Sequence, residues 1–140
     1  MLHRSTFYGI VGSAVIIAAM AAAIASHKVP DSHRPQVTLL YVGAEDCAPC
    51  REWQQHEKLA FSASPEFARL EYREVKSPTL FNLLKDENWP EDLRRYRDLL
   101  GPNAGVPLWL VIADEQVIQR GMGPSQWHSD VLPKISRLLR

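Results

Sequence analysis

Apolar and polar residues alternate in short blocks along most of the chain, and the periods of these blocks predict strands and helices in turn. Residues 37–42 form an apolar run rich in β-branched and aromatic side chains, which is typical of a buried strand. Charged and apolar residues alternate over 69–75, and this period of two predicts a second strand. The strongly apolar run 106–112 and the segment 117–120 are separated by a polar turn, so they predict a β-hairpin.

Helical spacing characterises the blocks between and after these strands. Residues 51–59 lack glycine and proline, residues 79–87 and 90–100 follow as two further helical stretches, and a last helix is predicted from an N-cap at Ser125 to Leu139. The apolar positions at helical spacing are Leu93, Tyr96 and Leu100, and then Trp127, Val131, Ile135 and Leu138. The order β-α-β-α-α-β-β-α predicts an α/β fold in which a small mixed sheet is flanked by helices on both faces.

The N-terminal segment has a different pattern, because residues 7–25 are almost wholly apolar. A helix of about 20 such residues spans the ~30 Å hydrocarbon layer of a bilayer. The segment predicts either a transmembrane anchor or a secretory signal cleaved after Ala25. We therefore expect an anchor or signal over 1–27, a proline-containing linker over 28–36 and a globular domain over 37–140.

Both interpretations of the N-terminal segment deliver the domain across a membrane. The expected location is the inner membrane with the domain facing the periplasm, or the periplasm itself if the segment is cleaved. The chain has 16 basic and 16 acidic residues, so its formal net charge is zero. This balance offers no electrostatic footprint for nucleic acid.

Candidate chemistry is concentrated in Cys47-Ala48-Pro49-Cys50, which contains both cysteines of the chain. The pair falls where the strand 37–42 gives way to the helix 51–59, so the cysteines are expected on the first helical turn. Free backbone N–H groups and the helix dipole favour a thiolate there, and they lower a cysteine pKa from its free value of ~8.5. Pro49 suits this turn because its missing N–H is not needed.

Other interpretations of a C-x-x-C pair are a zinc half-site and an inert structural disulfide. A structural zinc site needs four ligands, and the histidines show no suitable spacing near the cysteines. A disulfide that closes so small a loop restrains the unfolded chain little. The position of the pair between a strand and a helix favours a redox-active disulfide.

The segment 44–51 resembles the active-site segment of thioredoxins, and Gly105-Val106-Pro107 resembles the second signature of that family. Gly121 and Gly123 also match glycines that the family places after its last strand. The resemblance covers residues 36–140 and implies a thioredoxin-like fold. It further implies a cis proline that faces the cysteines. A cis peptide bond costs little free energy only when it precedes proline.

The resemblance implies a role for each matching residue. Cys47 would be the attacking thiol, Cys50 the resolving thiol, and Val106 and Pro107 the wall that receives the substrate backbone. The implied activity is that of a thiol–disulfide oxidoreductase acting on protein thiols and disulfides. It needs no cofactor and no metal beyond its own redox-active disulfide.

Two departures from the family pattern concern the environment of the cysteines. Asp46 replaces the usual tryptophan and follows Glu45, so two carboxylates oppose ionisation of the first thiol. Arg51, together with the helix start that contains Pro49, favours ionisation. We therefore expect Glu45, Asp46, Pro49 and Arg51 to tune the reactivity of Cys47.

The second departure is Tyr41, which stands where thioredoxins place a buried aspartate six residues before the nucleophile. This leaves open the proton acceptor for Cys50, for which Glu45, Glu57 and water are candidates.

The carboxylates beside the nucleophile lead us to expect that the protein reduces disulfides. Because the domain is expected outside the cytoplasm, its substrates would be exported proteins, and a separate protein would have to supply its electrons. An oxidase or isomerase of the same fold is the alternative within this chemistry. A copper-binding module that adds Met122 and His128 to the cysteines, and a scaffold with a vestigial cysteine pair, are alternatives from other classes.

Overall fold

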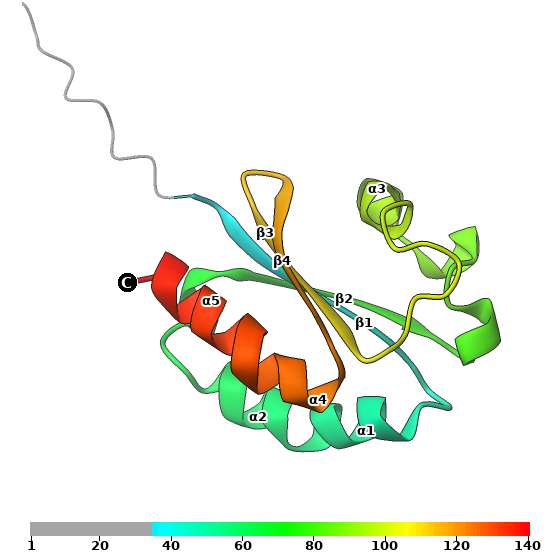
Figure 1. Cartoon of the computed structure of the whole chain (residues 1–140), viewed down its shortest axis with the longest axis horizontal. Helices are drawn as coiled ribbons and strands as arrows, with labels where there is room; N and C mark the ends of the chain where they lie inside the picture. The colour runs from blue at the N-terminus through cyan, green and yellow to red at the C-terminus, as the bar shows by residue number, and fades with distance from the viewer. Residues whose placement is uncertain (1–34) are drawn as a thin grey trace, which may run out of the picture. The chain divides into compact units, whose positions relative to one another are not determined.

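The fold is built on a four-stranded sheet with the spatial order β2-β1-β3-β4, seen in a computed structural model that describes residues 35–140 (Figure 1). The strands are β1 (Val37–Ala44), β2 (Glu71–Ser77), β3 (Leu108–Ala113) and β4 (Gln116–Met122). β1 pairs with β2 in parallel and with β3 antiparallel, and β3 pairs antiparallel with β4. The predicted mixed sheet and its terminal hairpin are therefore confirmed.

The central strand β1 contributes side chains to two cores, because successive side chains point to opposite faces of the sheet. Leu39 and Tyr41 belong to a core on one face, which also contains Trp53, Phe61, Trp109, Val111, Trp127, Val131 and Ile135. Leu40 and Val42 belong to a core on the other face, which also contains Val75, Leu83, Trp89, Leu93, Tyr96, Leu108 and Leu110. We call these the α1-face core and the α3-face core.

The α1-face core is covered by helices that run along one side of the sheet (Figure 1). They are α1 (Ala48–Gln55), α2 (Glu57–Ser62), α4 (Gly123–Gln126) and α5 (Leu132–Leu138), with a π turn η5 (Trp127–Val131) between the last two. The predicted helix over 51–59 is interrupted at His56, which separates α1 from α2. A short 3₁₀ turn, η1 (Phe67–Arg69), leads into β2.

The α3-face core is covered mainly by 3₁₀ turns, as well as by the single-turn helix α3 (Arg94–Arg97). The 3₁₀ turns are η2 (Leu80–Asn82), η3 (Asp86–Asn88) and η4 (Glu91–Leu93). Both faces of the sheet are thus covered, as the sequence predicts. The predicted burial of Leu93, Tyr96 and Leu100 is also confirmed.

The predicted helix over 79–87 is wrong, since this segment forms η2 and η3 instead. The Thr79 hydroxyl accepts the Asn82 N–H at 3.3 Å, and the Asn88 amide donates to the Asn82 carbonyl at 2.7 Å. The first bond caps the start of η2, and the second satisfies the Asn82 carbonyl, which a continuous helix would pair with a backbone N–H.

The C-terminal helical region begins at Gly123 with Met122 as its N-cap, so the predicted N-cap at Ser125 is three residues late. The Gln126 side chain accepts the Met122 N–H at 2.7 Å, which satisfies a backbone donor just before the helix. The π turn shifts the helical phase, so that Leu139 is buried and Leu138 only partly buried.

The predicted anchor or signal over 1–27 lies outside the described residues, as does most of the predicted linker over 28–36. Within 35–140, no helix is long and apolar enough to cross a bilayer. The first described strand begins at Val37, the residue at which the sequence places the start of the globular domain.

Candidate redox site

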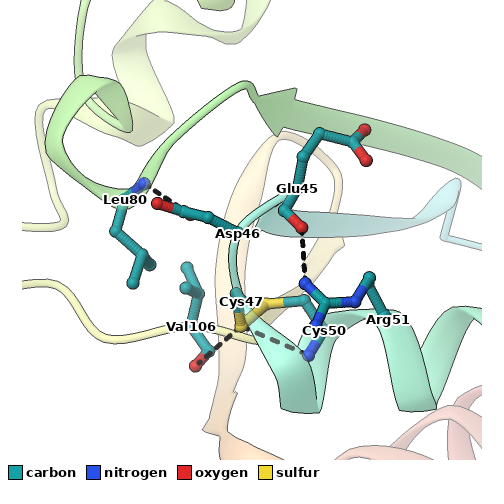
Figure 2. Close-up of a disulfide and its surroundings, with 7 residues drawn as sticks. All are labelled: Glu45, Asp46, Cys47, Cys50, Arg51, Leu80 and Val106. Atoms are coloured by element: carbon teal, nitrogen blue, oxygen red, sulfur yellow. Dashed lines mark hydrogen bonds between the residues drawn. A yellow bond between two sulfur atoms is a disulfide. The ribbon is translucent and has the colours of Figure 1, made fainter.

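The two cysteines lie where the chain leaves the end of β1 and enters α1 (Figure 2). Cys47 and Cys50 form a disulfide across a sequence separation of 3. The turn before it is held by backbone hydrogen bonds, with the Glu45 N–H donating to Ser77 at 2.9 Å and the Cys47 N–H donating to Ala44 at 3.3 Å. The end of the sheet therefore fixes the position of the disulfide.

Cys47 is the N-cap residue of α1, and its sulfur accepts the Cys50 N–H at 3.2 Å. A serine or aspartate cap makes the same contact with oxygen, so the sulfur occupies a position suited to an anion. Pro49 falls within the first turn of α1, where its missing N–H costs nothing. Both cysteines are buried, with Cys47 5% exposed and Cys50 2% exposed.

The segment before β3 forms the opposite wall of the site. The Val106–Pro107 peptide bond is cis, as the family resemblance implies. The Val106 carbonyl oxygen lies 3.9 Å from the Cys47 sulfur, so a residue 59 positions away in sequence contacts the candidate nucleophile. The roles of Val106 and Pro107 in binding substrate stay predictions.

The carboxylates of Glu45 and Asp46 are directed away from the sulfurs (Figure 2). The Asp46 carboxylate accepts the Leu80 N–H of η2 at 2.8 Å. The Arg51 guanidinium donates to the Glu45 carbonyl at 2.7 Å, so it closes the loop around the cysteines. Their electrostatic influence on Cys47 stays a prediction, and it acts through space rather than through a direct contact with sulfur.

A cavity of about 230 Å³ adjoins Cys50 and is lined by Tyr41, Glu45, Arg51, Gln54 and Lys76. Burial raises the pKa of the Tyr41 hydroxyl to about 12, and the charges of Glu74 and Glu45 add to this effect against a contact with Gln54. Tyr41 is therefore protonated at neutral pH and cannot replace a carboxylate as proton acceptor.

The two candidate carboxylates for accepting the Cys50 proton lie in different places. Glu45 lines the cavity beside Cys50. Glu57 lies on α2, with its carboxylate 3.4 Å from His128 Nε2. Glu45 shares this cavity with Cys50 and Glu57 does not, but the Glu45 carboxylate is turned away from the sulfurs (Figure 2), so the acceptor stays a prediction between Glu45 and water.

The residues considered for copper do not gather around the cysteines. His128 faces Glu57, and Met122 packs against Gly105, where a Cβ atom would meet its sulfur. Over residues 35–140, no group of three or more histidine, cysteine, aspartate or glutamate side chains is arranged to hold a metal ion.

The sequence analysis missed the η2 residues Leu80, whose N–H binds Asp46, and Phe81, which follows it in the chain. Phe81 is 92% exposed and Leu80 49%. The misassigned helix over 79–87 hid this feature, because a helix would have assigned Leu80 to a buried stripe.

No protein-family model matches the sequence, and no curated protein matches it. Solved structures do match. A thioredoxin of Malassezia sympodialis is 13% identical with a TM-score of 0.52, over 75% of this chain and 79% of that one. The periplasmic thioredoxin SoxS of Paracoccus pantotrophus is 17% identical with a TM-score of 0.50, over 74% of this chain and 96% of that one.

These similarities agree with the strand order, the cis proline and the disulfide at the start of α1. Because the sequence identities are this low, the similarities show the fold of the chain and not its substrates. The described part of this protein has the thioredoxin fold, with a Cys47–Cys50 pair that fits thiol–disulfide chemistry.

Proposed function

We propose that this protein is a thiol–disulfide oxidoreductase that reduces disulfide bonds in other proteins. The observation that carries the oxidoreductase activity is the position of the Cys47 sulfur, which accepts a helix N-terminal N–H and faces the carbonyl before the cis proline. Such a position stabilises a thiolate and leaves one side of the sulfur next to a backbone segment. Reduction as the direction rests on the Glu45 and Asp46 carboxylates, which oppose the thiolate.

The reaction begins from the reduced protein. The Cys47 thiolate attacks one sulfur of the substrate disulfide, a mixed disulfide forms, and the second substrate sulfur leaves as a thiolate. Cys50 then loses its proton to Glu45 or to water and attacks the Cys47 sulfur. The Cys47–Cys50 disulfide forms and the first substrate sulfur leaves as a thiolate, so two electrons have passed to the substrate.

We propose exported proteins as the substrates and a separate thiol protein as the electron donor. The apolar segment at 7–25 supports delivery across a membrane, since it suits an anchor or a signal. SoxS, a structural neighbour, is described as periplasmic, which agrees with this location.

Substitution of each cysteine by serine tests the proposal. The Cys47→Ser protein should lose reductase activity towards insulin disulfides completely, because it lacks the nucleophile. The Cys50→Ser protein should retain the first step and accumulate mixed disulfides, detected by non-reducing electrophoresis and mass spectrometry.

Circular dichroism of both variants provides the control for folding. Full activity in a folded Cys47→Ser protein would contradict the assignment of the nucleophile. A wild-type protein that reduces no disulfide would contradict the function.

One observation favours an oxidase or isomerase as the second candidate. The Cys50 N–H donated to the Cys47 sulfur stabilises the thiolate, and a stabilised thiolate makes a dithiol pair more oxidising. Asp46 and Glu45 act in the opposite direction, so the reduction potential decides between the two candidates.

A further inference from the structure

The 3₁₀ turn η2 is bonded to Asp46, the residue before Cys47, and it bears two exposed apolar side chains. Leu80 is bound through its N–H to Asp46, the residue directly before Cys47, and Phe81 follows it. Phe81 is the most exposed large apolar side chain among residues 35–140. Leu80 and Phe81 are called the η2 tip below.

The backbone of the η2 tip is held in place by hydrogen bonds from several directions. The Asp46 carboxylate binds the Leu80 N–H, and the Asn88 amide binds the Asn82 carbonyl at 2.7 Å. The indole N–H of buried Trp89 binds the Leu83 carbonyl, also at 2.7 Å. A fixed backbone offers an apolar side chain to a partner with little further loss of conformational entropy.

Other apolar side chains continue the surface around the disulfide. Val106 contacts Cys47 through its carbonyl and packs against the small cluster that contains both cysteines. Figure 2 shows Leu80 extending from η2 on the Val106 side of Cys47. Half-exposed Met122 packs against Gly105, which directly precedes Val106. Val106 and Leu80 thus place apolar groups on the same side of Cys47.

We propose that the η2 tip binds the chain segment that flanks the reactive cysteine of a protein substrate, and that it selects segments with an apolar side chain next to that cysteine. The inference rests on the proposed function, because disulfide exchange requires the substrate sulfur to reach Cys47. Its neighbouring residues must then lie over the surface around Cys47. An apolar side chain there covers Phe81, whereas a polar one leaves it against water.

Two peptides that differ only beside the cysteine test this proposal. One carries leucine on each side of its cysteine and the other carries serine, and each cysteine is joined to 5-thio-2-nitrobenzoate by a disulfide. Cys47 attacks the peptide sulfur, because the nitrobenzoate thiolate is the better leaving group, and its release is followed by absorbance. Cys50 then resolves the mixed disulfide and releases the peptide thiol. The measured quantity is the ratio of the two second-order rate constants.

The reduced full-length protein should react about tenfold faster with the leucine peptide than with the serine peptide. Phe81→Ser should reduce this ratio to about two or less. Leu59→Ser, which removes a 64% exposed leucine from α2, should retain it, and so should Phe81→Leu. Both peptides react with the same Cys47 thiolate, so a change in its reactivity alters both rate constants equally and leaves their ratio unchanged.

Asp46 is a positioning residue, because its carboxylate holds the backbone of the η2 tip. Asp46→Ala removes the acceptor of the Leu80 N–H and should lower the ratio, while Asp46→Asn keeps an acceptor oxygen and should preserve it. A wild-type ratio near one, or a ratio that survives Phe81→Ser, would overturn the proposed docking surface. If the wild-type protein releases nitrobenzoate from neither peptide, the proposed function itself fails.

Discussion

We expect the reactivity of Cys47 to depend on a few groups within four residues of its sulfur. The Cys50 N–H lies 3.2 Å from the Cys47 sulfur in the disulfide, and in the reduced protein this contact would stabilise a thiolate. The Glu45 and Asp46 carboxylates oppose it through space, since both are exposed and directed elsewhere. The Arg51 guanidinium donates one hydrogen bond to the Glu45 carbonyl, and its positive charge lies in the same loop.

The reduction potential of the Cys47–Cys50 pair tests this balance. Equilibration with glutathione should give a value closer to thioredoxin (~−270 mV) than to a strong oxidant (~−120 mV). Asp46→Asn should raise the potential by about 10 to 20 mV, because one charge that opposes the thiolate is removed while the acceptor of the Leu80 N–H remains. A wild-type potential above about −180 mV would instead identify an oxidase or isomerase.

The parts of the site that sequence reasoning identified are those with local signals. The cysteine pair at the start of a helix and the proline at the start of a strand each follow from a few adjacent residues. The partner of Asp46 did not follow, because Leu80 is 34 positions away and its contact depends on a turn. The sequence around Asp46 does not reveal that its carboxylate binds a distant backbone N–H, because such a contact leaves no local pattern.

The edge strand β2 contributes a partly buried ionic network on the same face of the sheet as α2. The Glu74 carboxylate accepts hydrogen bonds from Lys58 and from the Tyr72 hydroxyl, each at 2.9 Å. Burial alone would raise the pKa of Glu74. The bonds from Lys58 and Tyr72 and the charges of Lys58 and Lys76 outweigh it and lower the pKa from 4.5 to about 2.

This network predicts a loss of stability in acid. Because the pKa of Glu74 is lower in the folded than in the unfolded protein, its contribution is complete above pH 4.5 and disappears as the pH falls towards 2. At neutral pH, Glu74→Gln should lower the free energy of unfolding by about 1 kcal/mol, a value reduced for partial solvent exposure.

Urea unfolding between pH 7 and pH 2 measures this contribution. The difference between wild type and Glu74→Gln should shrink to zero by about pH 2. Glu91→Gln, on the exposed turn η4, serves as the matched control and should follow the wild-type curve. A difference between wild type and Glu74→Gln that does not change with pH would contradict the network.

Strong periodic elements were predictable, and short irregular ones were not. The strands β1 and β3 follow from continuous apolar runs, because both are buried on two faces. The segment 79–87 contains good helix formers, yet hydrogen bonds from Asn88 and Trp89 hold it in 3₁₀ turns. Such bonds depend on where the side chains lie after folding, and periodicity does not record them.

At the scale of the whole molecule, each face of the sheet supports a different part of the site. Trp53 of α1 stacks on Tyr41 at 4.7 Å and meets Trp127 edge-on at 5.0 Å, so the α1-face core fixes the helix that begins beside Cys47. Trp89 and Leu83 belong to the α3-face core, and they anchor the segment that carries the η2 tip.

This division predicts different consequences for two equally buried tryptophans. Trp53→Leu and Trp89→Leu should each lower the free energy of unfolding by about 3 kcal/mol, since each leaves a cavity in a core. Trp53→Leu should slow nitrobenzoate release from the leucine and serine peptides alike, because it disturbs the helix start that activates Cys47. Trp89→Leu should leave the serine peptide unaffected and lower the leucine preference, because it loosens only the η2 tip. Equal effects of both substitutions on both peptides would show that the two cores do not act separately on the site.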